Sequence, residues 1–286
     1  MINKKILITL IFLTSTLFSC KNINNTNNDF RNYELENITI KTNREDGSTH
    51  WNLSSKKAEY DKINQITKAV KPILHIYNDD IANIKATSRK ISLFEGSSKI
   101  ILNDNVLIEL LTDNKTQIRG EEMIWNPIEN TLYISNYSTI TFDHGSIRSQ
   151  KSSLNIKSMD IMFSGNVNLS LLLSKDNNKI QITADNGLWN ETTGVIQLDN
   201  SVSLDISNLD NTFNHKFKGS VLNGNIYSGD YSIEDCNYTN NNKQLTKSTN
   251  CFLSNNIDIK DVRSIILPNI ITFKSNEERP VTTIFK

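Results

Sequence analysis

Hydrophobic and polar residues alternate along most of the chain after about residue 35, and this two-residue period predicts β-strands. Clear runs include Val106, Ile108 and Leu110. Many of the apolar positions carry β-branched residues, and no stretch of ten or more residues has the 3.6-residue period of a helix. The pattern therefore predicts an all-β protein.

The strand pattern also repeats along the chain. A similar strand opening occurs at Ile84, Ile118, Ile147, Ile182 and Phe217, with spacings of 34, 29, 35 and 35 residues. This period is too long for one rung of a compact β-helix, and it suits three short strands with turns in a stacked or rolled array.

Polar joints recur between the second and third strands of these repeats, at residues 103–105, 164–166 and 199–201. They consist of Asn, Asp, Gly and Ser, and the first three of these tolerate a positive φ. The joints are therefore predicted to be tight turns. Trp125 and Trp189 follow two of the strand openings at the same offset, and both are predicted to serve hydrophobic packing.

The composition excludes several classes of function. Lys and Arg number 31, Asp and Glu number 31, and the pI is about 6.9. This balance argues against nucleic-acid binding that depends on counterion release. With 10 Gly and 4 Pro, the chain is neither collagen-like nor proline-rich. Asn is abundant, which we interpret as a compositional bias rather than a functional signal.

The first twenty residues are typical of a secretion signal. Lys4 and Lys5 precede an apolar run from Ile6 to Phe18, which is too short to span a bilayer comfortably. Leu17, Ser19 and Cys20 match a bacterial lipoprotein box, so Cys20 is predicted to become the lipidated first residue of the mature chain. An ordinary signal peptide and an uncleaved anchor are the alternatives. Residues 20–33 are predicted to form a flexible tether.

The two other cysteines, Cys236 and Cys251, flank a polar stretch. Export places them in an oxidising compartment, which favours a disulfide, and two free thiols are the alternative. We expect no metal site and no cofactor, because the four histidines are scattered singly.

Five further motifs carry a resemblance to a known family. They are Gly47-x-x-x-Trp51-x-Leu53, Ala58-x-Tyr60, Ile84-x-Ala86, Leu102-x-Asp104-Asn105-Val106, and the segment from Thr116 to Gly120. In these the chain resembles LptC, the periplasmic component of the lipopolysaccharide export machine, which is related to LptA and the OstA-like domains. The resemblance covers roughly residues 45–172, and the repeats from Ile182 look like further OstA-like units.

The resemblance implies a twisted β-jellyroll whose apolar trough accepts the acyl chains of lipopolysaccharide. It also implies partners, namely the ABC transporter subunits and LptA/OstA-like proteins joined through edge strands. We therefore expect a signal peptide at 1–19, a lipidated tether at 20–33, an LptC-like β-jellyroll at 34–173, and additional OstA-like repeats with a disulfide loop at 174–286. The expected location is the periplasm, with a lipid anchor in the inner membrane or, as the alternative, the outer membrane.

The alternating apolar residues are the candidates for contact with lipid. Each could equally be an ordinary core residue of a β-sandwich, and one face of a trough can serve both purposes. The candidates are Leu102, Val106, Ile108, Leu110, Ile134, Ile140, Phe142, Ile161, Phe163, Val167, Leu169, Leu171, Leu198, Val202, Leu204 and Ile206.

No catalytic motif was found, so the chain is not predicted to be an enzyme. Glu121 and Glu122 are adjacent on a predicted strand and would point to opposite faces, as would Glu277 and Glu278. A hidden glycan lyase or hydrolase remains a minor alternative. The main alternative is a surface-anchored β-sandwich lipoprotein that binds carbohydrate or protein. An open apolar trough would favour export, and a closed core with a polar groove would favour this binding module.

Overall fold

The computed structural model describes residues 32–78, 80–94, 99–143, 145–173, 178–208, 214–241, 245–254, 270–274 and 282–284. The chain divides into two units, residues 1–30 and 31–286, and every described residue belongs to the second. Within the described residues, no helix is long and apolar enough to cross a membrane. The predicted signal peptide, Cys20, and the pair Glu277 and Glu278 lie outside the described residues.

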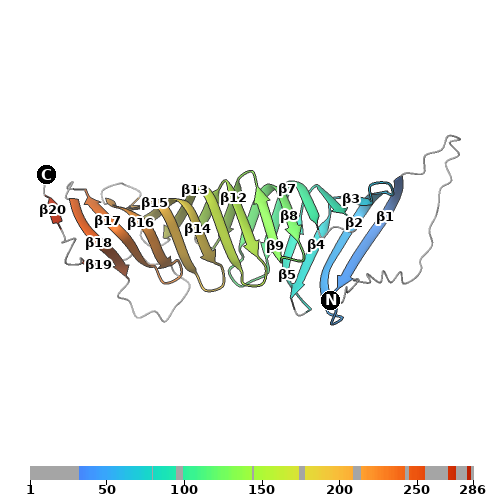
Figure 1. Ribbon diagram of the computed structural model, residues 1–286, viewed down its shortest axis with the longest axis horizontal. Coiled ribbons are helices and arrows are strands. Elements are labelled where there is room, and N and C mark those ends of the chain that lie inside the picture. Colours follow the sequence, from blue (N-terminus) through green and yellow to red (C-terminus); the bar gives the residue numbers. More distant parts are fainter. Residues whose placement is uncertain are drawn as a thin grey trace, which may run out of the picture. The chain divides into compact units, whose positions relative to one another are not determined.

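All regular structure in the described part of the chain is β-structure (Figure 1). The strands are β1 (Asn32–Asn43), β2 (Thr49–Asp61), β3 (Ile66–Val70), β4 (Ile73–Asn78), β5 (Ile81–Thr87), β6 (Lys90–Phe94), β7 (Ile100–Leu110), β8 (Gln117–Asn126), β9 (Thr131–Ser135), β10 (Ser138–Phe142), β11 (Gly145–Ser149), β12 (Lys151–Asn155), β13 (Asp160–Leu173), β14 (Asn178–Asn190), β15 (Val195–Asn208), β16 (Asn214–Asn225), β17 (Asp230–Asn240), β18 (Leu245–Ser254), β19 (Ile270–Lys274) and β20 (Thr282–Ile284). The prediction of an all-β fold is confirmed.

These strands form one antiparallel sheet that follows the order of the sequence. Long strands such as β7 and β13 cross the full width of the sheet, whereas pairs of short strands such as β3 and β4 share one crossing. We call each full crossing a rung. Every rung between the first and the last described one pairs with the rung before it and the rung after it, so the sheet is a continuous meander (Figure 1).

Each rung bends near its middle, and the sheet is therefore folded into two layers. The first layer contains β3, β6, β9, β12 and β19, and the second contains β4, β5, β10, β11 and β20. A long strand contributes one half to each layer. Aromatic contacts join the two layers, because Trp51 of β2 meets Trp125 of β8, and Phe142 of β10 meets Trp189 of β14, with ring centroids 6.2 and 5.1 Å apart.

Rungs that run from the first layer to the second, which we call outgoing rungs, bend at residues with positive φ. These residues are Asn37, Lys71, Asp104 and Asn105, Asn136 and Tyr137, Gly165 and Asn166, Asn200 and Ser201, and Asp235. At three of these corners the register shifts by a bulge, between Asn103 and Val106, Ser164 and Val167, and Asp199 and Val202. At these three corners the left-handed residues bend the strand without ending it, whereas β3 and β9 end before theirs.

Rungs that run back from the second layer to the first, the returning rungs, have no positive-φ residue among the described positions of their corners. Four of them instead place a serine there, whose hydroxyl donates a hydrogen bond to the carbonyl two residues later. The serines are Ser55, Ser88, Ser149 and Ser248, with distances of 2.7 to 2.9 Å. The outgoing rungs and these four returning rungs therefore bend between the layers by different means.

The prediction of hairpin turns at the three polar joints is wrong. Positive φ is present at each, but the chain continues in the same strand, within β7, β13 and β15. Asn, Asp and Gly supply left-handed residues to hairpins and to bulges alike, so the joint chemistry could not distinguish them.

The sequence repeat corresponds to one returning rung and one outgoing rung, not to three short strands. Asn126, Asn155, Asn190 and Asn225 end successive returning rungs, and the side-chain oxygen of each accepts a hydrogen bond from a backbone N–H of the following hairpin. Their spacings of 29, 35 and 35 residues equal those of the repeat from Ile118 onward. Much of the asparagine therefore has a structural role at hairpins and corners.

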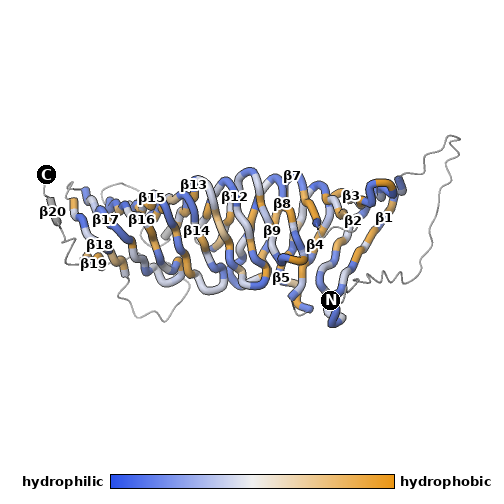
Figure 2. The backbone as a smooth tube through the Cα atoms, viewed as in Figure 1, coloured by the Kyte–Doolittle hydropathy of each residue, from blue (hydrophilic) through white to orange (hydrophobic). Residues whose placement is uncertain are grey.

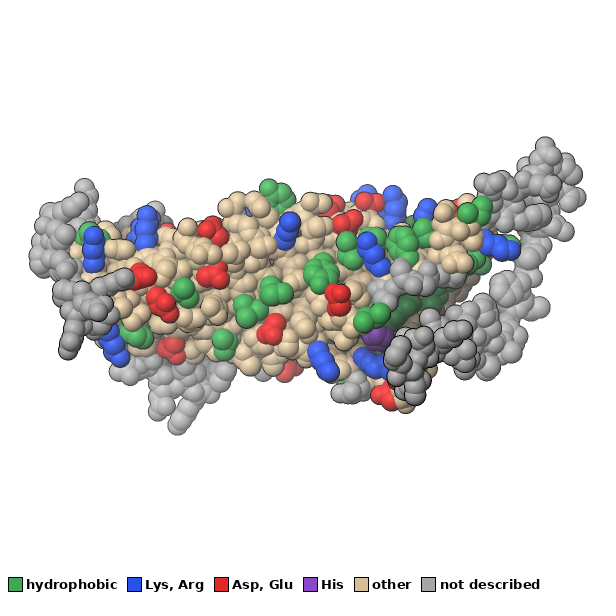
Figure 3. Space-filling view, in the orientation of Figure 1, with side chains coloured by type: hydrophobic (Ala, Val, Ile, Leu, Met, Phe, Trp, Pro, Cys, Tyr) green, Lys and Arg blue, Asp and Glu red, His purple; other side chains and the backbone are tan. Residues whose placement is uncertain are grey.

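The core lies between the two layers along the described rungs. Hydrophobic and hydrophilic positions alternate along many of the strands (Figure 2). More and less buried residues alternate along strands such as β3, β8 and β9, which is the expected pleat of a sheet with one face on a core. On the face seen in Figure 3, charged side chains of both signs are interspersed with small groups of apolar ones.

Candidate functional site

The predicted lipid-contact residues all lie on the inner faces of the two layers. Fifteen of the sixteen are buried, and Phe142 is partly buried. The first layer contributes Leu102, Ile134, Ile161, Phe163 and Leu198. The second layer contributes Val106, Ile108, Leu110, Ile140, Phe142, Val167, Leu169, Leu171, Val202, Leu204 and Ile206.

The interior between the described strands is filled by these side chains rather than open. Leu169 and Leu204, for example, are 0% exposed. The expectation of an open trough therefore does not hold for this conformation. A continuous band of aliphatic side chains crosses from rung to rung, and each of them is already shielded from water by the opposite layer.

Several polar groups are buried in this apolar interior without a hydrogen-bond partner. They include the indole nitrogens of Trp125 and Trp189 and the hydroxyl of Tyr231. Both tryptophans are 0% exposed, as predicted for hydrophobic packing. An unpaired buried donor costs free energy, on the order of 1–3 kcal/mol each. These donors are available to an acceptor that reaches the interior.

Burial favours the neutral forms of four titratable groups next to the interior, two histidines and two tyrosines. Burial, followed by the nearby Arg44, lowers the pKa of His50. Burial also lowers the pKa of His215, whose ring stacks on Tyr238, and raises the pKa of Tyr238. The burial of Tyr231 raises its pKa well above the usual value. Neutral forms are compatible with an apolar ligand.

The outermost strand at the N-terminal end is β1, and within the described sheet it pairs only with β2. Its other edge carries backbone donors and acceptors that can pair with a further strand. Leu35, Ile38 and Ile40 of β1 are partly buried against the core. At the C-terminal end, β19 and β20 both pair with β18.

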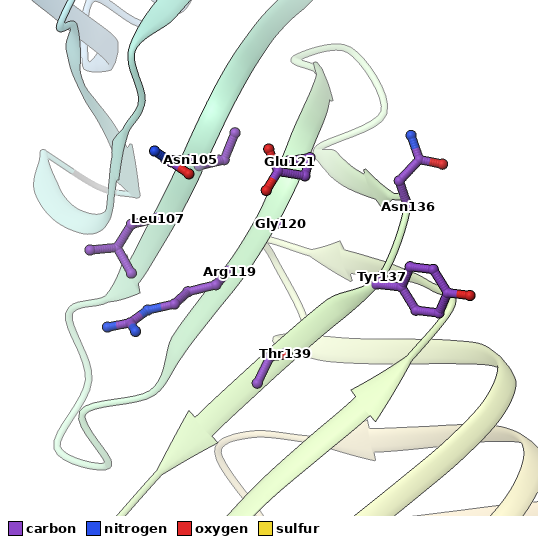
Figure 4. A pocket seen from close by; sticks show the side chains of 9 residues that line it. Asn105, Leu107, Arg119, Gly120, Glu121, Asn136, Tyr137 and Thr139 are labelled. Carbon is purple, nitrogen blue, oxygen red and sulfur yellow. The ribbon is translucent and has the colours of Figure 1, made fainter.

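A groove of about 640 Å³ lies on the outer side of the fold, where β7, β8 and the corner between β9 and β10 meet (Figure 4). Asn105, Arg119, Glu121, Asn136 and Tyr137 are among its lining residues. Tyr137 is 73% exposed, and in Figure 4 its ring points away from Arg119. The groove is open, its lining is partly polar and partly apolar, and its side chains do not converge on one point.

The other candidate residues are placed as follows. Glu121 is exposed and Glu122 is half-buried, so the two carboxylates do not share a face. Cys236 of β17 and Cys251 of β18 are joined by a disulfide, with their Cα atoms 5.8 Å apart. Among the residues that the structure describes, no cluster of three His, Cys, Asp or Glu side chains could hold a metal ion.

Sequence reasoning missed one group of residues. Glu191 follows Asn190 in the β14–β15 hairpin and is 0% exposed, although nothing in the local pattern marks it as buried. Its partners come from hairpins that are distant in sequence. No local signal could have found it, since the contact depends on how the two layers close.

Comparison with known families decides the assignment. Residues 6–171 match the family model of LptC, described as "Lipopolysaccharide-assembly, LptC-related". The chain belongs to this family. The match covers more than half of the chain, and it confirms the resemblance seen in the Trp51 and Asp104 motifs.

Other comparisons add less. A search of curated proteins found no match. Among solved structures, the chain is similar to LptH from Pseudomonas aeruginosa, described as the LptA homologous periplasmic component of the conserved lipopolysaccharide transport device. The TM-score is 0.33 and the identity is 9%, over 39% of this chain and 79% of LptH.

Proposed function

We propose that this LptC-family protein shields the acyl chains of lipopolysaccharide between its two layers and passes them along a bridge to the outer membrane. The observation that carries the proposal is the continuous aliphatic band, to which every rung from β2 to β18 contributes. Each methylene moved out of water is worth about 0.8 kcal/mol. A sheet that offers apolar contacts at successive rungs would let an acyl chain move without exposure to water.

A closed interior is the result expected of a binding module, so the proposal of lipid transport includes a displacement model. Two apolar layers protect each other from water when no lipid is present, which avoids a large exposed apolar surface. An acyl chain that enters between them replaces layer-to-layer contacts with layer-to-lipid contacts. The unpaired indole N–H groups of Trp125 and Trp189 would then donate to the carbonyl oxygens of acyl linkages.

Partners and location form part of the same proposal. β1 would pair with an edge strand of a partner in the export machine, such as an LptA/OstA-like protein or a component of the ABC transporter. Energy would come from ATP hydrolysis by that transporter, and the chain itself would act without a cofactor. We propose that the protein works in the periplasm and that lipidated Cys20 anchors it to a membrane.

Site-specific photo-crosslinking in cells tests the function. A photo-crosslinking residue at Leu169 faces the interior and should capture lipopolysaccharide. The same residue at Ser170 is the matched control, because adjacent strand positions point to opposite faces and Ser170 lies on the outer one. Capture at Leu169 should fall when the transporter is depleted. Equal capture at both positions would reject the proposal.

A binding module that recognises carbohydrate is the second candidate, and the open groove beside the exposed ring of Tyr137 favours it. Titration with oligosaccharides, followed by the tyrosine fluorescence and by NMR shifts of the groove residues, would detect such binding. Loss of binding in Tyr137→Ala, together with no lipid capture at Leu169, would favour this function over lipid transport.

A further inference from the structure

Three hairpins from opposite layers meet at one place along the open edge of the fold. The β7–β8 hairpin belongs to the second layer, whereas the β14–β15 and β16–β17 hairpins belong to the first. The residues that join them are 75 to 113 positions apart in sequence. At this place the two layers are held together on the side opposite the corners.

Glu191 is the centre of this contact. Its Oε1 accepts hydrogen bonds from the hydroxyls of Thr112, at 2.7 Å, and Thr116, at 3.0 Å. Thr116 is also 0% exposed. The other carboxylate oxygen, Oε2, is buried without a hydrogen-bond partner. Both donors are neutral, so the carboxylate is held by hydroxyl groups alone in these contacts.

The backbone of the same residue completes the contact. The Glu191 carbonyl accepts hydrogen bonds from Asn114 Nδ2, at 3.0 Å, and from the Tyr227 hydroxyl. The Glu191 amide donates to the Met159 carbonyl of the adjacent first-layer hairpin. Burial, and then the charges of Glu191 and Asp143, raise the pKa of Tyr227, so its hydroxyl stays a donor. We call Thr112, Asn114, Thr116, Glu191 and Tyr227 the clasp.

Burial of a carboxylate at the contact between the two layers has a cost in free energy. Removal of a charge from water is costly unless it is paired and fully hydrogen-bonded, and Glu191 leaves one oxygen without a partner. Separation of the hairpins would return that oxygen to water. The clasp therefore combines specific hydrogen bonds, which favour closure, with a desolvated charge, which favours opening.

The geometry of the sheet leaves this edge as the place where the layers can separate. At every corner the polypeptide itself runs from one layer to the other, so the layers cannot part there without breaking strand pairing. The hairpins on the opposite side are joined by side-chain contacts, which can be broken and remade.

We propose that acyl chains are admitted to the interior between the β7–β8 hairpin and the β14–β15 and β16–β17 hairpins, and that Glu191 keeps this contact reversible. The inference rests on the proposed function and adds the place of admission to it. An admitted chain would then contact buried aliphatic side chains of the interior, among them Leu169 of β13 and Leu204 of β15.

Three variants of the full chain test this inference. Glu191→Gln keeps the shape and removes the buried charge, so it should hold the clasp closed. The double variant Thr112→Val with Thr116→Val removes both hydroxyl donors at nearly constant volume, so it should open the clasp. Glu129→Gln alters a glutamate of the β8–β9 hairpin, which is exposed, and is the matched control.

Two measurements are made on the purified protein with lipopolysaccharide micelles. Hydrogen exchange of residues 111–116 and 191–194 reports the clasp without lipid, and the rate of lipid capture by a photo-crosslinker at Leu169 reports admission. We expect Glu191→Gln to slow both by about tenfold and the double valine variant to speed both by about tenfold. Protected exchange in β7 and β8 would verify that each variant is folded.

The outcomes separate this inference from the function on which it rests. Capture by the wild type at a rate that Glu191→Gln and the double variant do not change would overturn the clasp as the place of admission and leave the proposed function standing. Absence of capture in the wild type would reject the proposed function and the place of admission together. An effect of Glu129→Gln equal to that of Glu191→Gln would also count against the clasp.

Discussion

Outgoing and returning rungs make the same bend between the two layers, yet they use different residues to make it. The outgoing rungs place left-handed residues at the corner, such as Asn200 and Ser201, and some insert a bulge. Four returning rungs use a serine hydroxyl, as at Ser149, and keep φ negative. The bend therefore depends on backbone conformation in the outgoing rungs and on a side-chain hydrogen bond in these four returning rungs.

Among changes at the two kinds of corner, loss of the disulfide should lower the free energy of unfolding the most. Cys236 follows the corner residue Asp235 of an outgoing rung, and Cys251 follows the corner of the next returning rung, so the bond links the two kinds of corner. Closure of a 15-residue loop is worth about 3 kcal/mol in the chain-entropy model. Urea unfolding of Cys236→Ala with Cys251→Ala should show a loss of about this size.

Hydrogen exchange supplies the control for the disulfide. Protection should fall in β17 and β18 and stay unchanged in β2 and β3, because each rung forms strand pairing only with its neighbours and the clasp does not include β2 or β3. A uniform loss of hydrogen-exchange protection along all strands would show that the disulfide does not act locally on the two corners that it joins.

The next largest effect should come from a β-branched residue at an outgoing corner. Asn200 has a φ of 60°, which Asn tolerates and Val does not. Asn200→Val should lower the free energy of unfolding by about 2 kcal/mol. The matched change Asp185→Val, at the corner of returning rung β14, should stay within about 0.5 kcal/mol of wild type. Equal losses at both would remove the distinction.

Removal of a corner serine should cost less. Ser149 is 3% exposed, donates to the Lys151 carbonyl, and shares a hydrogen bond with the Ser138 hydroxyl at 2.9 Å. Ser149→Ala should lower the free energy of unfolding by about 1 kcal/mol, as measured by urea titration. Ser146→Ala, on the same strand but away from the corner, should have no measurable effect. A similar loss in both would contradict a special role of the corner hydroxyl.

The smallest expected change is a gain in stability. Tyr137 has a φ of 67° at an outgoing corner, where the equivalent residues are Asn105, Asn166 and Ser201. A bulky aromatic residue is strained in this region, and Asn is not. Tyr137→Asn should therefore raise the free energy of unfolding by about 0.5–1 kcal/mol. A loss of stability would mean that the exposed ring makes a compensating contact.

The strand pattern and the interior could be predicted from the sequence, because alternation within a strand depends only on near neighbours. Leu102 and Val106 are both inward-facing, as expected from their spacing. The continuity of the strand between them could not be predicted, since Asp104 and Asn105 suit a hairpin as well as a bulge. A wider search for spaced asparagines would have placed the hairpin ends, because Asn155, Asn190 and Asn225 follow the repeat.

The clasp lay beyond sequence reasoning for a physical reason. Thr112 and Glu191 are brought together by the bending and twisting of five intervening rungs, and each residue alone has the local pattern of an ordinary polar hairpin. Glu191 becomes a notable residue only through its burial. Contacts of this kind require the accumulated geometry of the whole sheet.

The two-rung repeat also means that the length of the sheet changes in steps of fixed size. Neighbouring strands lie about 4.8 Å apart, so gain or loss of one repeat changes the span of the sheet by roughly 10 Å. Because a repeat contains one rung in each direction, such a change leaves the polarity of the terminal strand as it was. A chain of this kind can be fitted to a wider or narrower gap in whole repeats while it still presents the same end to its neighbour.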